Sequence, residues 1–199
     1  MPTTTARPSP NLFTLKITIK HTKPPIWRRV TMPGSSTLEQ LHRTIQSVFD
    51  WSNSHLHDFE VGPIRIGCLE HWEEEADGMG DETVVTLDGL RLEPKGRIRY
   101  TYDFGDNWEH DILVEKVERP APGSEVFAIR CIAGRRRAPM EDSRGPWGWA
   151  NLIEAVNDPS HEDHDDMIEW TGGPVDPDEM DLDEINERLA LPWDERFSL

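Results

Sequence analysis

Residues 97–117 have the sequence RIRYTYDFGDNWEHDILVEKV, from which the architecture of this chain can be worked out. Gly105, Asp106 and Asn107 form a turn signal between two runs of strand-forming residues, which is typical of a β-hairpin. Side chains at alternate positions of the first run share one face of a strand, and these are Ile98, Tyr100, Tyr102 and Phe104. We therefore expect the hairpin to contribute aromatic residues to the core.

Two strands and one helix are expected near the start of the chain. Residues 12–20 alternate apolar and polar side chains, and residues 26–32 form a second strand after a bend at Lys23-Pro24-Pro25. Thr37 and Gln40 have the spacing of a capping box, which marks the start of a helix. The apolar residues that follow fall on one face of this helix: Leu38, Leu41, Ile45, Val48 and Phe49. The pattern predicts an amphipathic helix that packs on a sheet.

The remaining segments predict further strands and then helices. We expect a strand at residues 55–66, interrupted at Gly62-Pro63, and a short strand within residues 84–92. Residues 70–82 are acidic and lack an apolar period, which predicts a mobile surface loop. Three helices follow, at residues 147–156, at residues 160–170 and from Asp181 onward.

These patterns predict an α+β fold in which a mixed or antiparallel sheet is covered by an N-terminal helix. The strand–strand–helix–strand order gives the chain a β-grasp-like opening. We expect residues 1–11 to be a disordered tail and residues 12–199 to form a single domain. Within that domain, residues 12–145 form a sheet-rich body and residues 146–199 form an acidic helical segment.

The composition limits the classes of function that the chain can serve. The formal net charge is −17, and most of it lies in residues 154–199, where 16 acidic residues stand against two arginines. A protein of this charge is disfavoured as a nonspecific nucleic-acid binder, which needs a basic surface. Cys68 and Cys131 are too few for a disulfide framework, and neither a signal peptide nor a run of 18 apolar residues is present. We expect a cytoplasmic protein without a membrane partner.

One group of candidate functional residues surrounds the hairpin turn: His55, His57, Asp103, Asp106, Trp108 and His110. On a strand His55 and His57 point to the same face, and His110 shares a face with Trp108. If the two strands pair, imidazoles and carboxylates could converge to bind Zn, Mn or Fe, or to act as acid and base. The alternative is structural, with Asp103 and Asp106 closing the turn through Asx hydrogen bonds and Trp108 packing in the core.

A metal site at the hairpin has weak support from the sequence, because no recognised ligand spacing such as His-Glu-x-x-His is present. The candidate ligands are His57, His110 and Asp103. We expect no cofactor, with a divalent metal as the alternative.

A second group of candidates is basic and follows the hairpin: Arg130, Arg135, Arg136, Arg137 and Arg144, with Trp147 nearby. Guanidinium groups suit phosphate or carboxylate, and tryptophan faces suit stacking. This group could therefore bind an anion or a partner. The alternative is that the arginines pair with the acidic C-terminal segment of the same chain.

Five motifs stand in order along the chain: Pro24-Pro25-Ile26-Trp27-Arg28-Arg29; Trp51 with Ser54-His55-Leu56-His57-x-Phe59; Tyr100-x-Tyr102-Asp103-Phe104-Gly105-Asp106-x-Trp108-x-His110; Glu141-Asp142; and Gly145-Pro146-Trp147-Gly148. In these motifs, spread over roughly residues 13–189, the chain resembles the plasmid pRiA4b ORF-3-like family. The resemblance implies an α+β domain of bacterial or archaeal plasmids and chromosomes, in a family whose members are often described as passengers of mobile elements. It supplies no catalytic residue.

The chain departs from the family at one place. The resemblance implies that many relatives carry cysteines at the positions of Ala138 and Ser143, beside the one matching Cys131, and three thiolates with a histidine would suit structural zinc. Because this chain keeps Cys131 alone, we expect Arg136 and Arg137 to anchor the loop by pairing with carboxylates instead.

The preferred interpretation is a noncatalytic binding or adaptor module associated with mobile elements. It rests on the lack of a complete catalytic constellation beside abundant Trp and Arg, which favour interfaces. The partner would be a protein, a peptide or a phosphate-bearing ligand. One alternative is a metal-dependent hydrolase or nuclease that uses the His/Asp cluster around the hairpin from Tyr100 to His110. Another is nucleic-acid binding through the loop from Arg130 to Arg144.

Overall fold

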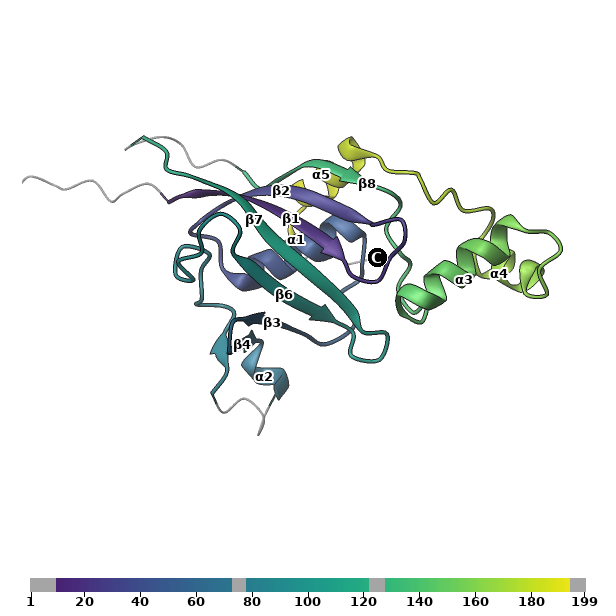
Figure 1. The fold of residues 1–199 in the computed structure, drawn as a ribbon, viewed down its shortest axis with the longest axis horizontal. Helices are drawn as coiled ribbons and strands as arrows, with labels where there is room; N and C mark the ends of the chain where they lie inside the picture. The colour runs from purple at the N-terminus through teal and green to yellow at the C-terminus, as the bar shows by residue number, and fades with distance from the viewer. Residues whose placement is uncertain (1–9, 73–77, 122–127, 194–199) are drawn as a thin grey trace, which may run out of the picture.

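The computed structural model describes residues 10–72, 78–121 and 128–193, and one large sheet dominates it (Figure 1). In this part of the chain the strands are β1 Leu12–Ile19, β2 Trp27–Pro33, β3 His57–Val61, β4 Ile64–Gly67, β5 Gly80–Asp81, β6 Arg97–Tyr102, β7 Trp108–Glu118 and β8 Arg130–Arg135. The helices are α1 Leu38–Phe49, α2 Leu69–Trp72, α3 Gly145–Asn157, α4 His164–Thr171 and α5 Leu182–Ala190.

The strand order is β5-β4-β3-β6-β7-β1-β2-β8. Neighbouring strands are antiparallel, except for the short parallel pair of β4 and β5. The sheet is therefore mixed, and the predicted α+β class is confirmed. Residues 1–9 of the predicted tail lie outside the described residues.

The β6–β7 hairpin lies in the middle of the sheet. Its register pairs Tyr102 with Trp108 and Tyr100 with His110. β7 continues beyond the hairpin and pairs along β1, so it joins the two halves of the sheet. Every second residue over the first part of β7 is buried: Trp108, His110, Ile112 and Val114. The hairpin is thus confirmed as the element around which the sheet is built.

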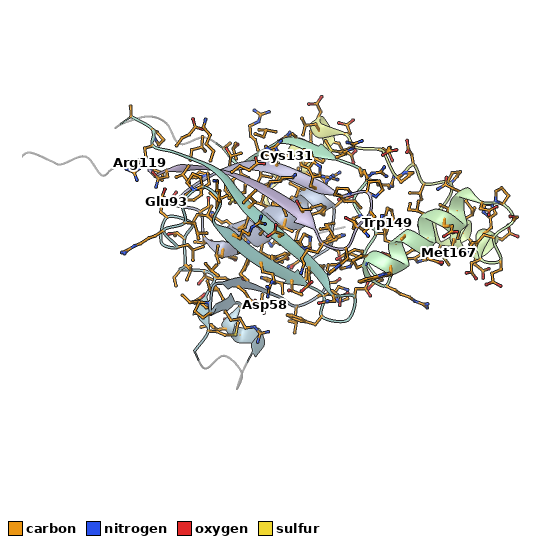
Figure 2. All side chains as sticks on the ribbon, viewed as in Figure 1. Asp58, Glu93, Arg119, Cys131, Trp149 and Met167 are labelled. Carbon is orange, nitrogen blue, oxygen red and sulfur yellow. The ribbon has the colours of Figure 1, made fainter. Side chains whose placement is uncertain are left out.

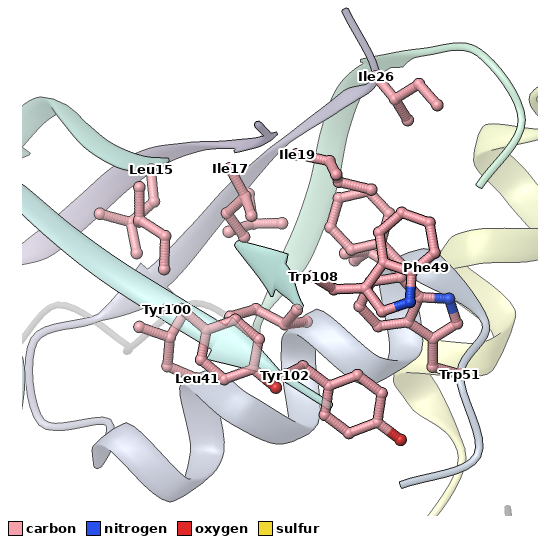
Figure 3. Packing of buried hydrophobic residues seen from close by; sticks show 14 of the residues in the cluster. Leu15, Ile17, Ile19, Ile26, Leu41, Phe49, Trp51, Tyr100, Tyr102 and Trp108 are labelled. Carbon is pink, nitrogen blue, oxygen red and sulfur yellow. The ribbon is translucent and has the colours of Figure 1, made fainter. Parts of the chain in front are cut away.

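Helix α1 covers one face of the sheet, behind β6, β7 and β1 in Figure 1. It begins with the predicted capping box, in which Gln40 N donates to Thr37 Oγ1 and Thr37 N donates to Gln40 Oε1. The buried side of the helix meets the aromatic residues of the hairpin, and Figure 3 shows Leu41 and Phe49 beside Tyr100 and Trp108. The core therefore lies between this helix and the sheet.

Among the described residues no helix covers the opposite face of the sheet (Figure 1). Ion pairs between strands occupy this face instead. Arg29 makes two hydrogen bonds to Glu115, from Nε to Oε2 at 2.5 Å and from Nη2 to Oε1 at 2.8 Å. The other pairs between strands are Arg99–Glu60, Arg97–Asp111 and Arg65–Asp58. One face of the sheet is thus a core and the other is a charged surface.

Three segments differ from the sequence prediction. Residues 70–82, expected to form a mobile surface loop, include most of α2 and all of β5. The strand expected within residues 84–92 is wrong, because this segment forms turns against the start of α1. There the carbonyl of Val85 accepts from Leu38 N and the carbonyl of Glu82 accepts from Glu39 N, which satisfies the free N–H groups of the first helical turn. Glu82 is therefore buried rather than part of a surface loop.

Strand β8 also differs from the prediction, because the sequence indicates an arginine-rich loop at these residues. It forms one edge of the sheet beside β2. On its outer side, Cys131 N donates to Asn186 Oδ1 at 3.0 Å, and Asn186 Nδ2 donates to the Cys131 carbonyl at 2.9 Å. A side chain of α5 thus binds both backbone groups of one residue at the sheet edge.

The three predicted C-terminal helices are present, although α4 begins at His164 rather than at residue 160. α3 and α4 extend beyond one end of the sheet as a helical arm, with Trp149 near its base and Met167 farther out (Figure 2). Trp149, Leu152 and Val156 are buried on the inner side of this arm. In the described residues, no helix combines the length and the apolar composition needed to cross a membrane.

Candidate functional site

Three segments meet at the turn of the β6–β7 hairpin. Asp103 lies in the turn itself, His55 follows α1 and precedes β3, and Asp142 lies in the loop before α3. The His55 Nε2 atom is 3.2 Å from Asp142 Oδ1 and 3.7 Å from Asp103 Oδ2. One imidazole nitrogen and two carboxylate oxygens thus lie within 4.8 Å of one another. We call these three residues the turn cluster.

The surroundings of the turn cluster fix its position. Asp103 Oδ1 accepts from Gly105 N at 2.9 Å and from Asp106 N at 3.3 Å, so the predicted Asx bonding of the turn is confirmed for Asp103. Its other oxygen, Oδ2, is the one that faces His55. Asp103 has a positive φ of 55°, a conformation that aspartate tolerates better than most residues.

The loop that carries Asp142 is bound to the hairpin through its neighbour Glu141. The Tyr102 hydroxyl donates to Glu141 Oε1 at 2.6 Å, and Ser52 N donates to Glu141 Oε2 at 2.7 Å. Burial, together with this hydrogen bond to the carboxylate, raises the pKa of Tyr102 far above its usual value. The phenol therefore remains a donor at neutral pH, and the loop is held in place.

Asp106 connects the same turn to the start of α3. Gly145 has a positive φ of 71°, and a Cβ at this position would lie 2.3 Å from the Asp106 carbonyl oxygen. Only glycine permits this close approach. The Asp106 carboxylate is not part of the turn cluster, although its Oδ2 atom is buried and has no hydrogen-bond partner within the described part of the chain.

His57 belongs to a separate, buried network. Its Nε2 atom donates to Glu82 Oε2 at 2.7 Å, and its ring stacks on that of His42 with a centroid distance of 3.5 Å. His42 Nε2 donates to Asn53 Oδ1 at 2.7 Å, so Nδ1 is left to accept from the Tyr100 hydroxyl at 2.8 Å. The network lines a pocket of about 510 Å³ that also includes His55.

His110 lies in the hydrophobic core and belongs to neither the turn cluster nor the His57 network. Its Nδ1 atom donates to the Trp108 carbonyl at 2.9 Å, and burial lowers its pKa to about 4. Tyr100 stands between the two histidines, because its ring centroid is 5.8 Å from that of His57 and 5.2 Å from that of His110. The expected convergence of His55, His57 and His110 is therefore wrong.

Trp108 packs in the core beside Trp51, at a ring-centroid distance of 5.6 Å (Figure 3). This matches the structural interpretation of that residue. The six candidates around the hairpin thus divide among the turn cluster, the His57 network, the hairpin turn and the core.

The arginine group is also divided. Arg130 and Arg135 are exposed at opposite ends of β8, roughly 16 Å apart at the usual rise of a strand. Arg136 Nη2 lies 3.1 Å from Asp178 Oδ1, and Arg137 pairs with Glu179. Arg144 precedes α3 with a positive φ of 63°. Arg136 and Arg137 therefore anchor the loop to the acidic C-terminal segment, as the sequence suggested.

Arg136 also lines a cavity of about 450 Å³ between the β1–β2 turn and α3. Trp147, whose surface is 71% exposed, stacks on His21 there with a centroid distance of 5.3 Å. Thr22, Lys23 and Trp149 complete its polar and aromatic lining. We call this cavity the Trp147 pocket, and among the described residues that line it none is acidic.

All five motifs noted in the sequence contribute residues to the turn cluster or to the Trp147 pocket. A model of the family described as "Plasmid pRiA4b ORF-3-like protein" matches residues 11–184. The chain belongs to the pRiA4b ORF-3-like family. It is 35% identical over 184 residues to "Uncharacterized protein y4hQ" of Sinorhizobium fredii (strain NBRC 101917 / NGR234), covering 90% of this chain and 92% of that one.

A solved structure supports the same fold for this pRiA4b ORF-3-like protein. The crystal structure of a protein of unknown function, MM3350 from Methanosarcina mazei Go1, matches with a TM-score of 0.77 and 35% identity. The match covers 88% of this chain and 98% of that one. These relatives establish the family and the fold, and neither of their descriptions states an activity.

Sequence reasoning missed several residues of these sites. His42 could have been found, because it stands four positions after Leu38 on the buried face of α1. Asp142 can be recognised from the sequence only as part of the Glu141-Asp142 family motif. Glu82 gave no signal, since it lies in an acidic stretch whose other residues resemble surface positions.

Proposed function

We propose that this pRiA4b ORF-3-like protein is a noncatalytic binding module, and that its ligand carries a phosphate group and a planar ring. The Trp147 pocket is the proposed binding site. The observation that supports this most is the lack of carboxylates among its described lining residues, in a chain with a net charge of −17. At this pocket an approaching anion would meet Lys23 and Arg136.

Other cavities differ from the Trp147 pocket in charge. Four further cavities in the described part of the chain each include at least one carboxylate among their lining residues. A carboxylate repels a phosphate group at short range, and this repulsion is strong where water is partly excluded. The distribution of charge therefore favours the Trp147 pocket for an anionic ligand.

Arg136 supplies a donor suited to such a ligand. Its side chain is 17% exposed and holds one ion pair, with Asp178. Its Nε atom is buried and has no hydrogen-bond partner within the described residues. An unsatisfied buried donor costs about 1–3 kcal/mol, and a phosphate oxygen would recover part of that free energy. Arginine also binds phosphate in two-point geometry, which lysine does not.

Trp147 supplies a surface for a planar ring. Its exposed indole is already half of a stacked pair with His21, and stacking on tryptophan accepts any flat aromatic group. The cavity volume of about 450 Å³ falls within the range of small-molecule sites, roughly 300–1,000 Å³. Both features suit a nucleotide-sized ligand better than a large folded partner.

Binding can be tested with three probes that separate the two chemical parts of the ligand. We expect adenosine 5′-monophosphate to bind the full chain more tightly than ribose 5-phosphate or adenosine, as measured by calorimetry and tryptophan fluorescence. Trp147→Ala should weaken the binding of the nucleotide by roughly 5- to 150-fold, which corresponds to about 1–3 kcal/mol of stacking. Arg136→Gln should weaken both phosphate-bearing probes and leave adenosine unaffected.

Two matched variants serve as controls for this test. Trp170→Ala removes an exposed tryptophan of α4, and Arg137→Gln removes the neighbouring arginine, which does not line the pocket. Both should bind the nucleotide as the parent chain does. The proposal fails if none of the probes binds at millimolar concentration, or if the control variants lose as much affinity as the pocket variants.

The cellular context is part of the same proposal. The description of the family names a plasmid, which supports an association with mobile elements. The chain has only two cysteines, Cys68 and Cys131, which are too few for a disulfide framework and suit a protein of the reducing cytoplasm. A protein or peptide that presents a phosphate group would satisfy the same pocket, so an adaptor role is compatible with the chemistry proposed for a small ligand.

A further inference from the structure

We infer that the turn cluster of His55, Asp103 and Asp142 binds one divalent first-row metal ion of the zinc or manganese class. This site lies at the hairpin turn and is separate from the Trp147 pocket, so it does not depend on the proposed ligand. It also differs from the set expected from the sequence, since His57 and His110 are not among its ligands.

The spacing of the three ligand atoms fits a metal centre. Bonds from zinc to imidazole nitrogen or carboxylate oxygen are about 2.0–2.2 Å, so two ligands of a tetrahedral site lie roughly 3.3–3.6 Å apart. The His55 nitrogen lies 3.2 Å from the Asp142 oxygen and 3.7 Å from the Asp103 oxygen. All three atoms lie within 4.8 Å of one another, so modest side-chain rotations would bring them to bonding distance around one ion.

The orientation of His55 supports the same conclusion. Its Nε2 atom is buried and has no hydrogen-bond partner among the described residues, although two carboxylate oxygens lie within 4 Å. A nitrogen that served only as a hydrogen-bond donor would point its N–H group along the line to one of these oxygens. Here the nitrogen makes no such hydrogen bond, and it lies with the two oxygens in a group whose atoms are all within 4.8 Å of one another, close enough to bind one ion.

Interactions behind the ligands hold them in this arrangement. Backbone N–H groups bind Asp103 Oδ1 and leave Oδ2 to face His55, and such outer contacts orient the ligands of known metal sites. Asp142 is placed by the two hydrogen bonds of Glu141. The site is therefore built before any ion arrives, because its three segments are already joined by bonds that do not involve the metal.

The ligand types limit which metal fits. Imidazole suits zinc, iron, copper and nickel, whereas carboxylates also suit manganese, magnesium and calcium. One nitrogen with two oxygens therefore favours zinc or manganese over calcium or magnesium, which prefer oxygen ligands alone. The Asp142 side chain is 71% exposed, so water can complete the coordination. Three protein ligands and an open position are the composition of many zinc sites that bind a further molecule.

Metal binding can be measured on the full chain after treatment with a chelator. Calorimetry with Zn²⁺ or Mn²⁺ alone should show one ion per chain at this site, whereas Mg²⁺ and Ca²⁺ should bind much more weakly. His55→Ala and Asp142→Asn should each weaken binding by at least about tenfold, because the loss of a ligand exceeds the tenfold or greater loss caused by changing an outer contact. Zn²⁺ should also raise the melting temperature of the parent chain, because the ion binds the folded state.

Matched controls separate this site from the other histidines and carboxylates. His161→Ala and Asp166→Asn change residues near the start of α4 and should bind zinc as the parent chain does. Asp142→Asn changes an exposed side chain, so the metal-free variant should keep the melting temperature of the parent chain and lose only the increase caused by zinc. Binding that is absent in the parent chain, or that is equal in His55→Ala and His161→Ala, would overturn the inference.

Discussion

The two faces of the sheet show how differently one set of strands can use its side chains. The face behind the hairpin buries Trp108 and Tyr100 against α1, whereas the other face carries pairs such as Arg29–Glu115 in contact with solvent. Both faces come from the same strands, because successive residues of a strand point in opposite directions. Residues that are neighbours in sequence therefore differ greatly in what they contribute.

The contrast between the two faces shows which side chains stabilise the fold. A large buried side chain contributes several kcal/mol, whereas an exposed ion pair contributes roughly 0–1 kcal/mol. The charged face instead limits association, since a bare apolar sheet would attract other molecules. We expect substitutions on the two faces to differ in size, in their dependence on pH and in their dependence on salt.

The largest effect should come from the buried face. Trp108→Ala should lower the free energy of unfolding by about 3–5 kcal/mol, because it leaves a cavity between the hairpin and Trp51. Urea unfolding would measure this loss. Glu109→Ala, one residue along the same strand and on the charged face, should cost less than about 1 kcal/mol. Equal losses in the two variants would contradict the comparison.

The buried face should also dominate the response to acid. The folded state protonates His110 only near its lowered pKa of about 4, whereas the unfolded chain takes up that proton near 6.5. The unfolded state therefore binds more protons between these values, and stability should fall as the pH drops from about 6.5 to about 4. The full loss corresponds to roughly 3 kcal/mol, at 1.36 kcal/mol for each pKa unit.

A substitution can isolate this contribution. His110→Gln should flatten the dependence of the unfolding free energy on pH over that range, even though the variant is less stable throughout. His161→Gln, which changes a histidine outside the core, should keep the slope of the parent chain. If the slope of His110→Gln matches that of the parent, the acid response arises elsewhere.

The smallest effect should come from the charged face. The hydrogen bonds from Arg29 hold the pKa of Glu115 below its usual value, yet both side chains are partly exposed and screened by water. A double-mutant cycle with Arg29→Ala and Glu115→Ala should give a coupling of about 0–1 kcal/mol that decreases as salt is added. A coupling above about 2 kcal/mol that is insensitive to salt would show that this face is part of the core after all.

The elements that the sequence predicted best are those with strong local signals. The hairpin follows from Gly105-Asp106-Asn107 between strand-forming residues, and α1 follows from its capping box and one apolar face. β8 escaped prediction because it lies at the sheet edge, where only Cys131 is buried and the alternation is hidden by arginines. Residues 84–92 failed because their contacts with the start of α1 replace strand pairing.

The sites were harder to predict than the fold, because each joins residues far apart in sequence. The sequence analysis included His55 and Asp103 among the candidates but grouped them with His57. The reason is that the strand was predicted to begin at residue 55, two residues too early. In the structure β3 begins at His57, so His55 lies before the strand and turns toward Asp142. One misplaced strand boundary was enough to group His55 with His57 rather than with Asp142.

The bond between Asn186 and Cys131 has a consequence for self-association. The outer edge of β8 would otherwise offer a free N–H and C=O to a strand of another molecule, which is how sheets grow into aggregates. The Asn186 amide supplies the same donor and acceptor that a neighbouring strand would, and it closes that position. Helix α5 therefore blocks the pairing of a further strand with β8 at this position of the sheet edge.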